Sequence, residues 1–229
     1  MWPIYTLLSI AIIVYLFRPR RFYIVRHGET VLNAQGIKQG EEGELSENGR
    51  VQAEAVGNFL KPFAIQRIIT STYPRARETA EIINQSLHVS IVYSKLFSER
   101  ISPTEVIGKS VSDPIVASII DRTELSYHED EYRYSDEESF LDLKERARKC
   151  LSLMSRQGPT TTCIVTHRAF LKMLIAYLLY RESLHASDFV KLSYFNYSNN
   201  AGVTICEFQP WRLFSPTRGW RVISFNEMV

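Results

Sequence analysis

The stretch RFYIVRHGET, residues 21–30, is the part of this sequence from which the fold and the site follow most directly. Its apolar run FYIV, residues 22–25, is short, rich in β-formers and bounded by arginines, which predicts a buried strand. The letters RHGET follow at once and place Arg26 and His27 where this strand ends. Parallel sheets bind ligands at the carboxyl ends of their strands, so we expect a polar site here.

Short β-rich runs alternate with longer segments of helical period along the rest of the chain. We predict further strands at residues 67–70, 89–93 and 161–166, and helices over residues 46–60, 74–87, 137–154 and 168–180. The runs TICEF and WRVISF flank the turn signal SPTRG, which predicts an antiparallel hairpin at a sheet edge. This alternation predicts an α/β fold, a three-layer α/β/α sandwich with a mostly parallel central sheet.

The helical period also predicts which faces of two helices are buried. In residues 46–60 the apolar face comprises Val51, Ala55, Val56, Phe59 and Leu60. In residues 137–154 it comprises Phe140, Leu143, Ala147, Leu151 and Met154. We expect both faces to pack against the rest of the domain.

Charged and polar side chains follow each strand that we predict to be parallel. Arg26 and His27 follow the first strand, Arg75 the second, Glu99 the third and His167 the fourth. Because these strand ends share one edge of the sheet, we expect the five side chains to converge. Arginine forks suit phosphate oxygens, and the helix N-termini expected after Pro74 and His167 add backbone N–H groups. The edge is therefore predicted to bind an anion.

These residue types suit phosphoryl transfer. A neutral imidazole with a free lone pair can attack phosphorus and form a phosphohistidine. We expect Glu99 to protonate the leaving alkoxide and, once ionised, to activate the water that attacks the phosphohistidine. The arginines and His167 would neutralise charge as Mg²⁺ does in kinases, so no metal and no cofactor is expected.

Several sequence blocks occur in a fixed order along the chain: RHGET with Asn33 close behind, then KQGEEGELSENG, STYPRARETA, LFSER and VTH. Together these blocks resemble the histidine phosphatase superfamily, also called the phosphoglycerate-mutase-like family. The resemblance covers most of residues 21–225. It implies a three-layer α/β/α fold and metal-independent hydrolysis of phosphomonoesters through a phosphohistidine.

The resemblance also implies roles for individual residues. It makes His27 the phosphorylated nucleophile and Glu99 the proton donor, and it assigns the binding of the phosphoryl group to Arg26, Arg75 and His167. Asn33 and Gln39 match positions that often contact the phosphate or the substrate. Glu105, six residues beyond Glu99, is the alternative for the acid.

Arg168 departs from the family pattern, which commonly has glycine after the second histidine. A glycine there lets the backbone approach a ligand closely. An arginine would narrow the pocket, point into solvent or add a cationic group for a larger anionic substrate.

Length, charge and cysteine content limit the alternatives. The 229 residues suit one globular domain with a small addition. With 27 Lys and Arg against 25 Asp and Glu, the net charge of +2 gives no sign of a nucleic-acid binder. The three cysteines are widely spaced, which favours neither a disulfide framework nor a zinc site and indicates a reducing compartment.

The N-terminal segment MWPIYTLLSIAIIVYLF, residues 1–17, contains no charged side chain and is followed by RPRR. As a helix it would be about 25 Å long, near the lower limit for crossing a bilayer, and the arginines would hold the rest of the chain in the cytoplasm. We therefore predict a single-pass membrane anchor over residues 1–17 and a cytoplasm-facing catalytic domain over residues 18–229. If this segment is instead a buried helix or a misassigned start, a cytoplasmic protein is expected.

Three functions fit these features. We favour hydrolysis of a phosphorylated small molecule or a phosphoprotein. A mutase is the second, although VLNAQGIKQGEEGEL stands where common cofactor-dependent mutases carry the W-N and F-x-G-W-x-D segments. The third is a membrane-tethered phosphate-binding module that has lost turnover because of Arg168.

Overall fold

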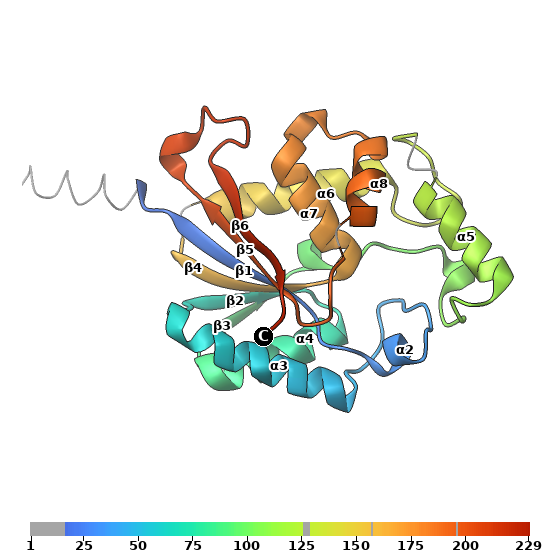
Figure 1. Cartoon of the computed structure of the whole chain (residues 1–229), viewed down its shortest axis with the longest axis horizontal. Coiled ribbons are helices and arrows are strands. Elements are labelled where there is room, and N and C mark those ends of the chain that lie inside the picture. The colour runs from blue at the N-terminus through green and yellow to red at the C-terminus, as the bar shows by residue number, and fades with distance from the viewer. Residues whose placement is uncertain (1–16, 126–128, 157, 196) are drawn as a thin grey trace, which may run out of the picture.

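A six-stranded sheet forms the centre of the molecule, in the order β3-β2-β4-β1-β5-β6 (Figure 1). The computed structural model describes residues 17–125, 129–156, 158–195 and 197–229. Four strands are parallel to one another: β1 (Arg20–Arg26), β2 (Arg67–Thr70), β3 (Ser90–Tyr93) and β4 (Thr161–Thr166). Strand β5 (Val203–Phe208) is antiparallel to β1 and pairs with the edge strand β6 (Trp220–Glu227). The predicted mostly parallel sheet with a hairpin at its edge is confirmed.

Helices cover both faces of this sheet (Figure 1). Helices α3 (Glu47–Leu60) and α4 (Pro74–Leu87) lie on one face. Helices α6 (Phe140–Ser155), α7 (Arg168–Tyr180) and α8 (Ala186–Phe195) lie on the other. The short helix α2 (Val31–Ala34) and helix α5 (Pro114–Leu125) lie beyond the carboxyl ends of the parallel strands (Figure 1). Single 3₁₀ turns occupy Lys61–Phe63, Lys95–Phe97, Thr104–Val106, Arg181–Ser183 and Pro210–Arg212.

Strand β1 shows how the sequence creates the layers. Its side chains alternate between the two faces of the sheet, as the period of a strand requires. Tyr23 and Val25 pack with residues of α3 and α4, whereas Phe22 and Ile24 pack with residues of α6 and α7. All five apolar residues predicted to face inward from residues 137–154 are buried. The helix–sheet–helix layering therefore follows from two apolar faces on each central strand.

Helix α3 buries only part of the face that its apolar residues predict: Val56 and Leu60 are buried, and Ala55 and Phe59 are half-buried. Val51 is 57% exposed, so its predicted burial was wrong. The buried residues of this helix are Gly49, Ala53, Val56, Gly57 and Leu60. A Cβ atom on Gly57 would lie 3.2 Å from the carbonyl oxygen of Ile83 in α4, so glycine allows the two helices to pack closely. An apolar period assigns no weight to glycine, which is why the prediction included Val51 and missed Gly49 and Gly57.

Two further sequence predictions concern the N-terminus and the cysteines. The predicted apolar helix over residues 1–17 falls, apart from Phe17, outside the described residues. Within the described ranges, no helix has the length and apolar character needed to cross a membrane. Cys150, Cys163 and Cys206 are all buried and unpaired.

Candidate active site

The ends of strands β1 and β4 bring two histidines together. These strands are parallel neighbours, and Arg26 at the end of one is opposite Thr166 at the end of the other. His27 and His167 follow directly, and the backbone N–H of His27 donates to the carbonyl of Thr166 at 2.9 Å. The two imidazole ring centroids are 5.1 Å apart. The convergence expected from the strand ends is therefore present for both histidines.

His27 is held as a neutral imidazole with one free ring nitrogen. Its Nδ1 lies 2.7 Å from the carbonyl oxygen of Gly28, so Nδ1 carries the proton and donates it there, leaving the lone pair on Nε2. Burial, followed by the positive charges of Arg75 and Arg26, lowers the pKa of His27 well below its usual value of about 6.5. A buried, uncharged ring with an available lone pair has the form that a nucleophile needs.

Gly28 allows the loop that follows β1 and carries His27 to lie directly on helix α3. A Cβ atom on Gly28 would lie 2.4 Å from the carbonyl oxygen of Gly49, closer than non-bonded atoms approach. The backbone N–H of Gly28 donates to Thr79 Oγ1 of α4 at 3.1 Å. The carbonyl that orients His27 is therefore fixed by two helices.

Arg26 and Arg75 are buried, and backbone carbonyls hold one end of each guanidinium. Arg26 Nη1 donates to Ser198 O at 2.6 Å. Arg75 Nη1 donates to the carbonyls of Gly40, Glu41 and Glu42 at 3.0, 3.2 and 3.0 Å. In the described part of the chain, the buried Nε of each arginine has no hydrogen-bond partner. Both arginines line the cavity described below, so these two donors are available to a ligand that accepts hydrogen bonds.

His167 occupies the same region as a second neutral imidazole. It is completely buried, and its Nε2 lies 2.8 Å from Ser71 Oγ. Its Nδ1 has no hydrogen-bond partner among the described residues. Burial lowers the pKa of His167 well below its usual value, and the neighbouring His27 and Arg75 lower it further. Ser71, which sets the orientation of this ring, was not assigned a role from the sequence, although it is the first residue of the block STYPRARETA.

The carboxylate of Glu99 lies at the N-terminus of helix α7. Glu99 Oε1 accepts hydrogen bonds from the backbone N–H groups of Arg100, Phe170 and Ala169 at 2.9, 3.0 and 3.1 Å. Glu99 Oε2 accepts a longer hydrogen bond, at 3.3 Å, from the backbone N–H of Ala169. A negative charge is favoured at this end of a helix. The expectation that the amides after His167 bind the substrate anion was wrong, because Glu99 already occupies those of Ala169 and Phe170.

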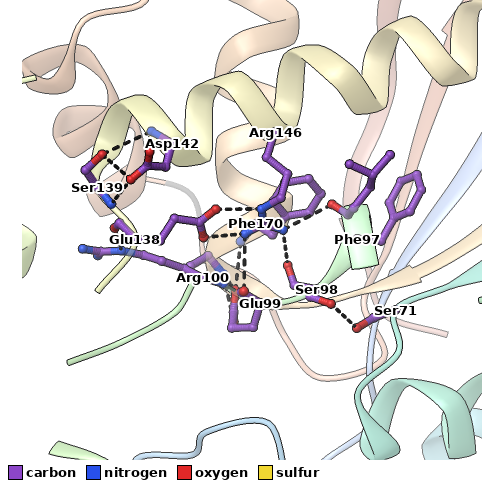
Figure 2. Close-up of polar contacts among 12 residues, drawn as sticks. Ser71, Phe97, Ser98, Glu99, Arg100, Glu138, Ser139, Asp142, Arg146 and Phe170 are labelled. Carbon is purple, nitrogen blue, oxygen red and sulfur yellow. Dashed lines mark hydrogen bonds and ion pairs between the residues drawn. The ribbon is translucent and has the colours of Figure 1, made fainter. Parts of the chain in front are cut away.

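Arg146 of helix α6 holds the segment that carries Glu99 (Figure 2). Its Nη1 donates to the carbonyls of Ser98 and Leu96 at 2.6 and 3.2 Å, and its Nη2 donates to that of Glu99 at 3.3 Å. The same guanidinium forms a bidentate ion pair with Glu138 at 2.8 and 2.6 Å. Sequence reasoning missed Arg146, since a cation beside an apolar helix face ordinarily lies in solvent.

A cavity of about 470 Å³ opens over these residues. Of the seven residues predicted for the site, six line it: Arg26, His27, Asn33, Gln39, Arg75 and Glu99. Helix α5, which was not predicted, contributes Ala117, Ile120, Asp121 and Glu124 to the wall. Glu105 does not line the cavity and accepts a hydrogen bond from Ser135 Oγ at 3.0 Å. The geometry therefore favours Glu99 over Glu105 as the acid.

Asn33 and Gln39 lie on the cavity wall with different partners. Asn33 Oδ1 accepts a 3.4 Å hydrogen bond from Asn200 Nδ2, which also donates to the carbonyl of His27 at 3.2 Å. Gln39 Nε2 donates to Thr30 Oγ1 at 2.7 Å. In the ranges described, no three histidine, cysteine or carboxylate side chains lie close enough together to hold a metal ion.

Comparisons with known proteins match this chain to one family. The family model of the histidine phosphatase superfamily (branch 1) matches residues 22–216. The 6-phosphofructo-2-kinase/fructose-2,6-bisphosphatase of Aquarana catesbeiana is 31% identical over 165 residues, which cover 70% of this chain and 33% of that protein. The chain thus spans about a third of that relative.

Two further relatives are matched over most of their own length. A protein of Erwinia tasmaniensis named "Probable phosphoglycerate mutase GpmB" is 31% identical over 169 residues, which cover 69% of this chain and 74% of that protein. The solved structure of Bacillus stearothermophilus YhfR matches with a TM-score of 0.74 and 27% identity, covering 92% of this chain and 98% of that one.

Proposed function

Because this chain belongs to the histidine phosphatase superfamily, we propose that it hydrolyses phosphomonoesters through a phosphohistidine formed on His27. The substrate is a phosphorylated small molecule or a phosphoprotein. One observation carries the proposal: the Nδ1 of His27 donates to Gly28 O, which leaves the lone pair on Nε2 of a residue that lines the cavity with Arg26 and Arg75. The ring of His167 lies beside it, 5.1 Å away between centroids. This is the arrangement that nucleophilic attack on phosphorus requires.

The first step forms the phosphoenzyme. The lone pair on His27 Nε2 forms an N–P bond while the P–O bond to the leaving group breaks. Glu99 enters this step protonated and gives its proton to the leaving oxygen, and the amides of Ala169 and Phe170 stabilise the carboxylate that results. The donors that lack partners, Arg26 Nε and Arg75 Nε, are available to the phosphoryl oxygens as charge develops. Ser71 donates its hydroxyl proton to His167 Nε2, which leaves the ring proton on Nδ1. His167 Nδ1 is then a further donor to the phosphoryl oxygens.

The second step releases phosphate. The Glu99 carboxylate takes a proton from a water molecule, whose oxygen attacks phosphorus as the N–P bond breaks. The electron pair of that bond returns to Nε2, so His27 is again a neutral imidazole and Glu99 is again protonated. The side-chain cations supply the charge neutralisation throughout, so no step is assigned to a metal.

A phosphoglycerate-type mutase is the second candidate, and the name of the Erwinia tasmaniensis relative favours it. A mutase would share the first step and would return the phosphoryl group to an acceptor hydroxyl instead of water. The fate of the phosphoryl group separates the two: a phosphatase releases inorganic phosphate in an amount equal to the alcohol, and a mutase does not.

The experiment that tests the proposal is hydrolysis of p-nitrophenyl phosphate by the full chain in the presence of excess EDTA. We expect turnover that persists in EDTA and is abolished by His27→Ala. His185→Ala is the matched control, because His185 is an exposed histidine whose Nδ1 lies 3.7 Å from Asp130 and which does not line the cavity. Phosphate binding without turnover by the folded wild-type chain would contradict the proposal and indicate a binding module.

A further inference from the structure

A second cavity, of about 370 Å³, adjoins the one over His27. The two cavities share part of their wall, including Lys38, Glu99 and Arg168. The second cavity extends along helices α7 and α8. It is lined by Lys172 of α7, by Phe189 of α8 and by Tyr197, which follows α8. A molecule whose phosphoryl group lies at His27 therefore has adjacent space for its remainder.

Positive charge exceeds negative charge in the two cavities together. Their combined lining contains six cationic side chains and three carboxylates: Arg26, Lys38, Arg75, Arg100, Arg168 and Lys172 against Glu99, Asp121 and Glu124. The whole chain has a net charge of only +2, so this excess of three is a local feature. The arginines near His27 account for one anionic group, and the cations farther along the wall require a separate explanation.

Arg168 and Lys172 lie one turn apart on the same face of helix α7. The guanidinium of Arg168 lies over the ring of Tyr197, at 5.4 Å from its centroid. Lys172 Nζ donates to the carbonyl of Ser193 in α8 at 2.6 Å. Within the described ranges, neither residue forms an ion pair with a carboxylate, and neither does Lys38. Tyr197 and the Ser193 carbonyl therefore position these two side chains without neutralising their charge. The carboxylates of Glu124 and Glu99 attract Lys172 without pairing with it.

The ionisation of Lys172 agrees with the excess of positive charge around it. Burial, followed by the positive charge of Arg168, lowers the pKa of Lys172 to about 8. Burial also lowers the pKa of Lys38. A bound anion beside these groups would relieve their repulsion.

We propose that Arg168, Lys172 and Lys38 form a second anion-binding subsite, which selects phosphomonoesters that carry a further phosphate or carboxylate group. This inference rests on the proposed function, because it assumes that the reacting phosphoryl group lies at His27. It also assigns a role to Arg168, which stands where the family commonly has glycine. The arginine extends the recognition of the substrate along α7.

Substrates that differ only in a second charge test this subsite. The set comprises an alkyl phosphate, the α,ω-alkanediol bisphosphate of the same chain length and the corresponding ω-phosphooxy carboxylate. We expect kcat/KM of the wild-type full chain to be at least about tenfold higher for a two-anion substrate than for the alkyl phosphate, which corresponds to about 1.4 kcal/mol. Lys172→Met and Arg168→Gly should each reduce this ratio several-fold or more. The matched control is Lys191→Met, because Lys191 is an exposed lysine of α8 that lines neither cavity. This variant should leave the ratio unchanged.

Equal kcat/KM values for all three wild-type substrates, or a ratio unaffected by Lys172→Met and Arg168→Gly, would overturn the subsite. If no substrate turns over, the proposed function fails and the subsite is tested by binding. Calorimetry on the His27→Ala chain would then compare the alkanediol bisphosphate with inorganic phosphate. Tighter binding of the bisphosphate, weakened by Lys172→Met, would support the subsite, and equal affinities would refute it.

A separate observation concerns the loop that joins β5 to β6. Trp211, Leu213 and Phe214 in this loop are 49%, 54% and 103% exposed, and Arg212 and Arg218 lie among them in the sequence. Exposed large apolar side chains that lie together commonly mark an interaction surface. Trp220, at the start of β6, is buried, so the exposed aromatic side chains of this hairpin lie at its tip.

The position of this tip indicates its partner. Phe208, at the end of β5, pairs with Arg20 at the start of β1, so the loop lies beside the point where the chain enters the domain from residues 1–17. The active-site cavity lies at the opposite end of β1, where Arg26 lines it. Residues 1–17 contain no charged side chain, and Arg18, Arg20 and Arg21 follow them.

We infer that the hairpin tip contacts an anionic lipid surface, with its apolar side chains among the acyl chains and its arginines at the headgroups. This contact would direct the active site away from the membrane. The test uses Trp2→Phe protein mixed with vesicles that contain phosphatidylserine and brominated phosphatidylcholine. Trp211 should be quenched, whereas Trp211→Phe, which retains only the buried Trp220, should show little quenching. Binding without quenching of Trp211, or no binding, would overturn the inference.

Discussion

The imidazole rings of His27 and His167 lie 5.1 Å apart between centroids and are tilted by 59° to one another. Both are buried, and both have lowered pKa values, so neither ring contributes positive charge near neutral pH. Their hydrogen bonds differ: His27 uses Nδ1 toward Gly28 O, whereas His167 uses Nε2 toward Ser71 Oγ. The free nitrogen is thus Nε2 in His27 and Nδ1 in His167, which separates a nucleophile from a phosphoryl-binding group.

Replacement of His167 should slow the chemistry without removing the nucleophile. We expect His167→Asn to lower kcat by about 10²–10³, the usual effect of losing one donor that stabilises developing charge. The phosphoenzyme should still form, which rapid quenching with ³²P-labelled substrate would detect. If His167→Asn abolished the phosphoenzyme as completely as His27→Ala does, the division of roles between the two histidines would be wrong.

The pH dependence should show an unusually low acidic limit. Burial and the charges of Arg75 and Arg26 lower the pKa of His27, so its ring stays neutral when the pH falls through the usual histidine range. We therefore expect kcat/KM, corrected for ionisation of the substrate, to remain level as the pH falls through about 6.5. A decline with an apparent pKa of about 6.5 or higher would indicate an exposed or differently paired nucleophile.

Arg146 should act as a positioning residue for Glu99, since it binds the carbonyls of Leu96, Ser98 and Glu99. A general acid matters most when the leaving group is a poor one. Arg146→Met should therefore lower kcat for an alkyl phosphate at least about tenfold more than kcat for p-nitrophenyl phosphate, within the 10²–10⁴ that general acids contribute.

The control for this variant is Arg148→Met on the same helix, where the exposed Arg148 pairs only with Glu145 among the residues described. It should leave the dependence on the leaving group unchanged. A purely structural role for Arg146 would lower the rates for both substrates by the same factor, and that result would remove the positioning role.

Gly28→Ala should destabilise the fold because its Cβ would lie 2.4 Å from Gly49 O. We expect a loss of about 1–3 kcal/mol in the free energy of unfolding, the usual range for overpacking. At about 2–4 °C per kcal/mol, thermal unfolding would report a clear drop in Tm. Gly158→Ala is the control, because the nearest atom to its Cβ would be Arg67 Nη2 at 3.7 Å. Equal Tm values for the two variants would show that the loop can move away from α3.

The sheet and much of the site could be predicted because local patterns determine them. The apolar run of β1 and the polar residues that follow it identify a strand and its functional end, and the parallel topology then brings His27, Arg75, Glu99 and His167 together. These steps need only the period of each segment and the order of segments along the chain.

Other features depend on contacts that no local pattern encodes. The buried face of α3 combines the apolar Val56 and Leu60 with glycines that let the helix approach α4 and the loop after β1. The amides at the start of α7 were expected to face the ligand, but Glu99 reaches them from another strand end. Arg146 and Lys172 have ordinary positions in helical sequences, and their significance appears only from the carbonyls and cavities beside them.

The most direct test of the central claim is the identity of the phosphorylated atom. Wild-type full chain would be quenched in base within milliseconds of mixing with substrate, digested and examined by mass spectrometry and ³¹P NMR. We predict a phosphoryl group on Nε2 of His27, stable in base and labile in acid, and absent from His27→Ala. Turnover without any phosphoenzyme, or a phosphoryl group on His167 or another residue, would contradict the account.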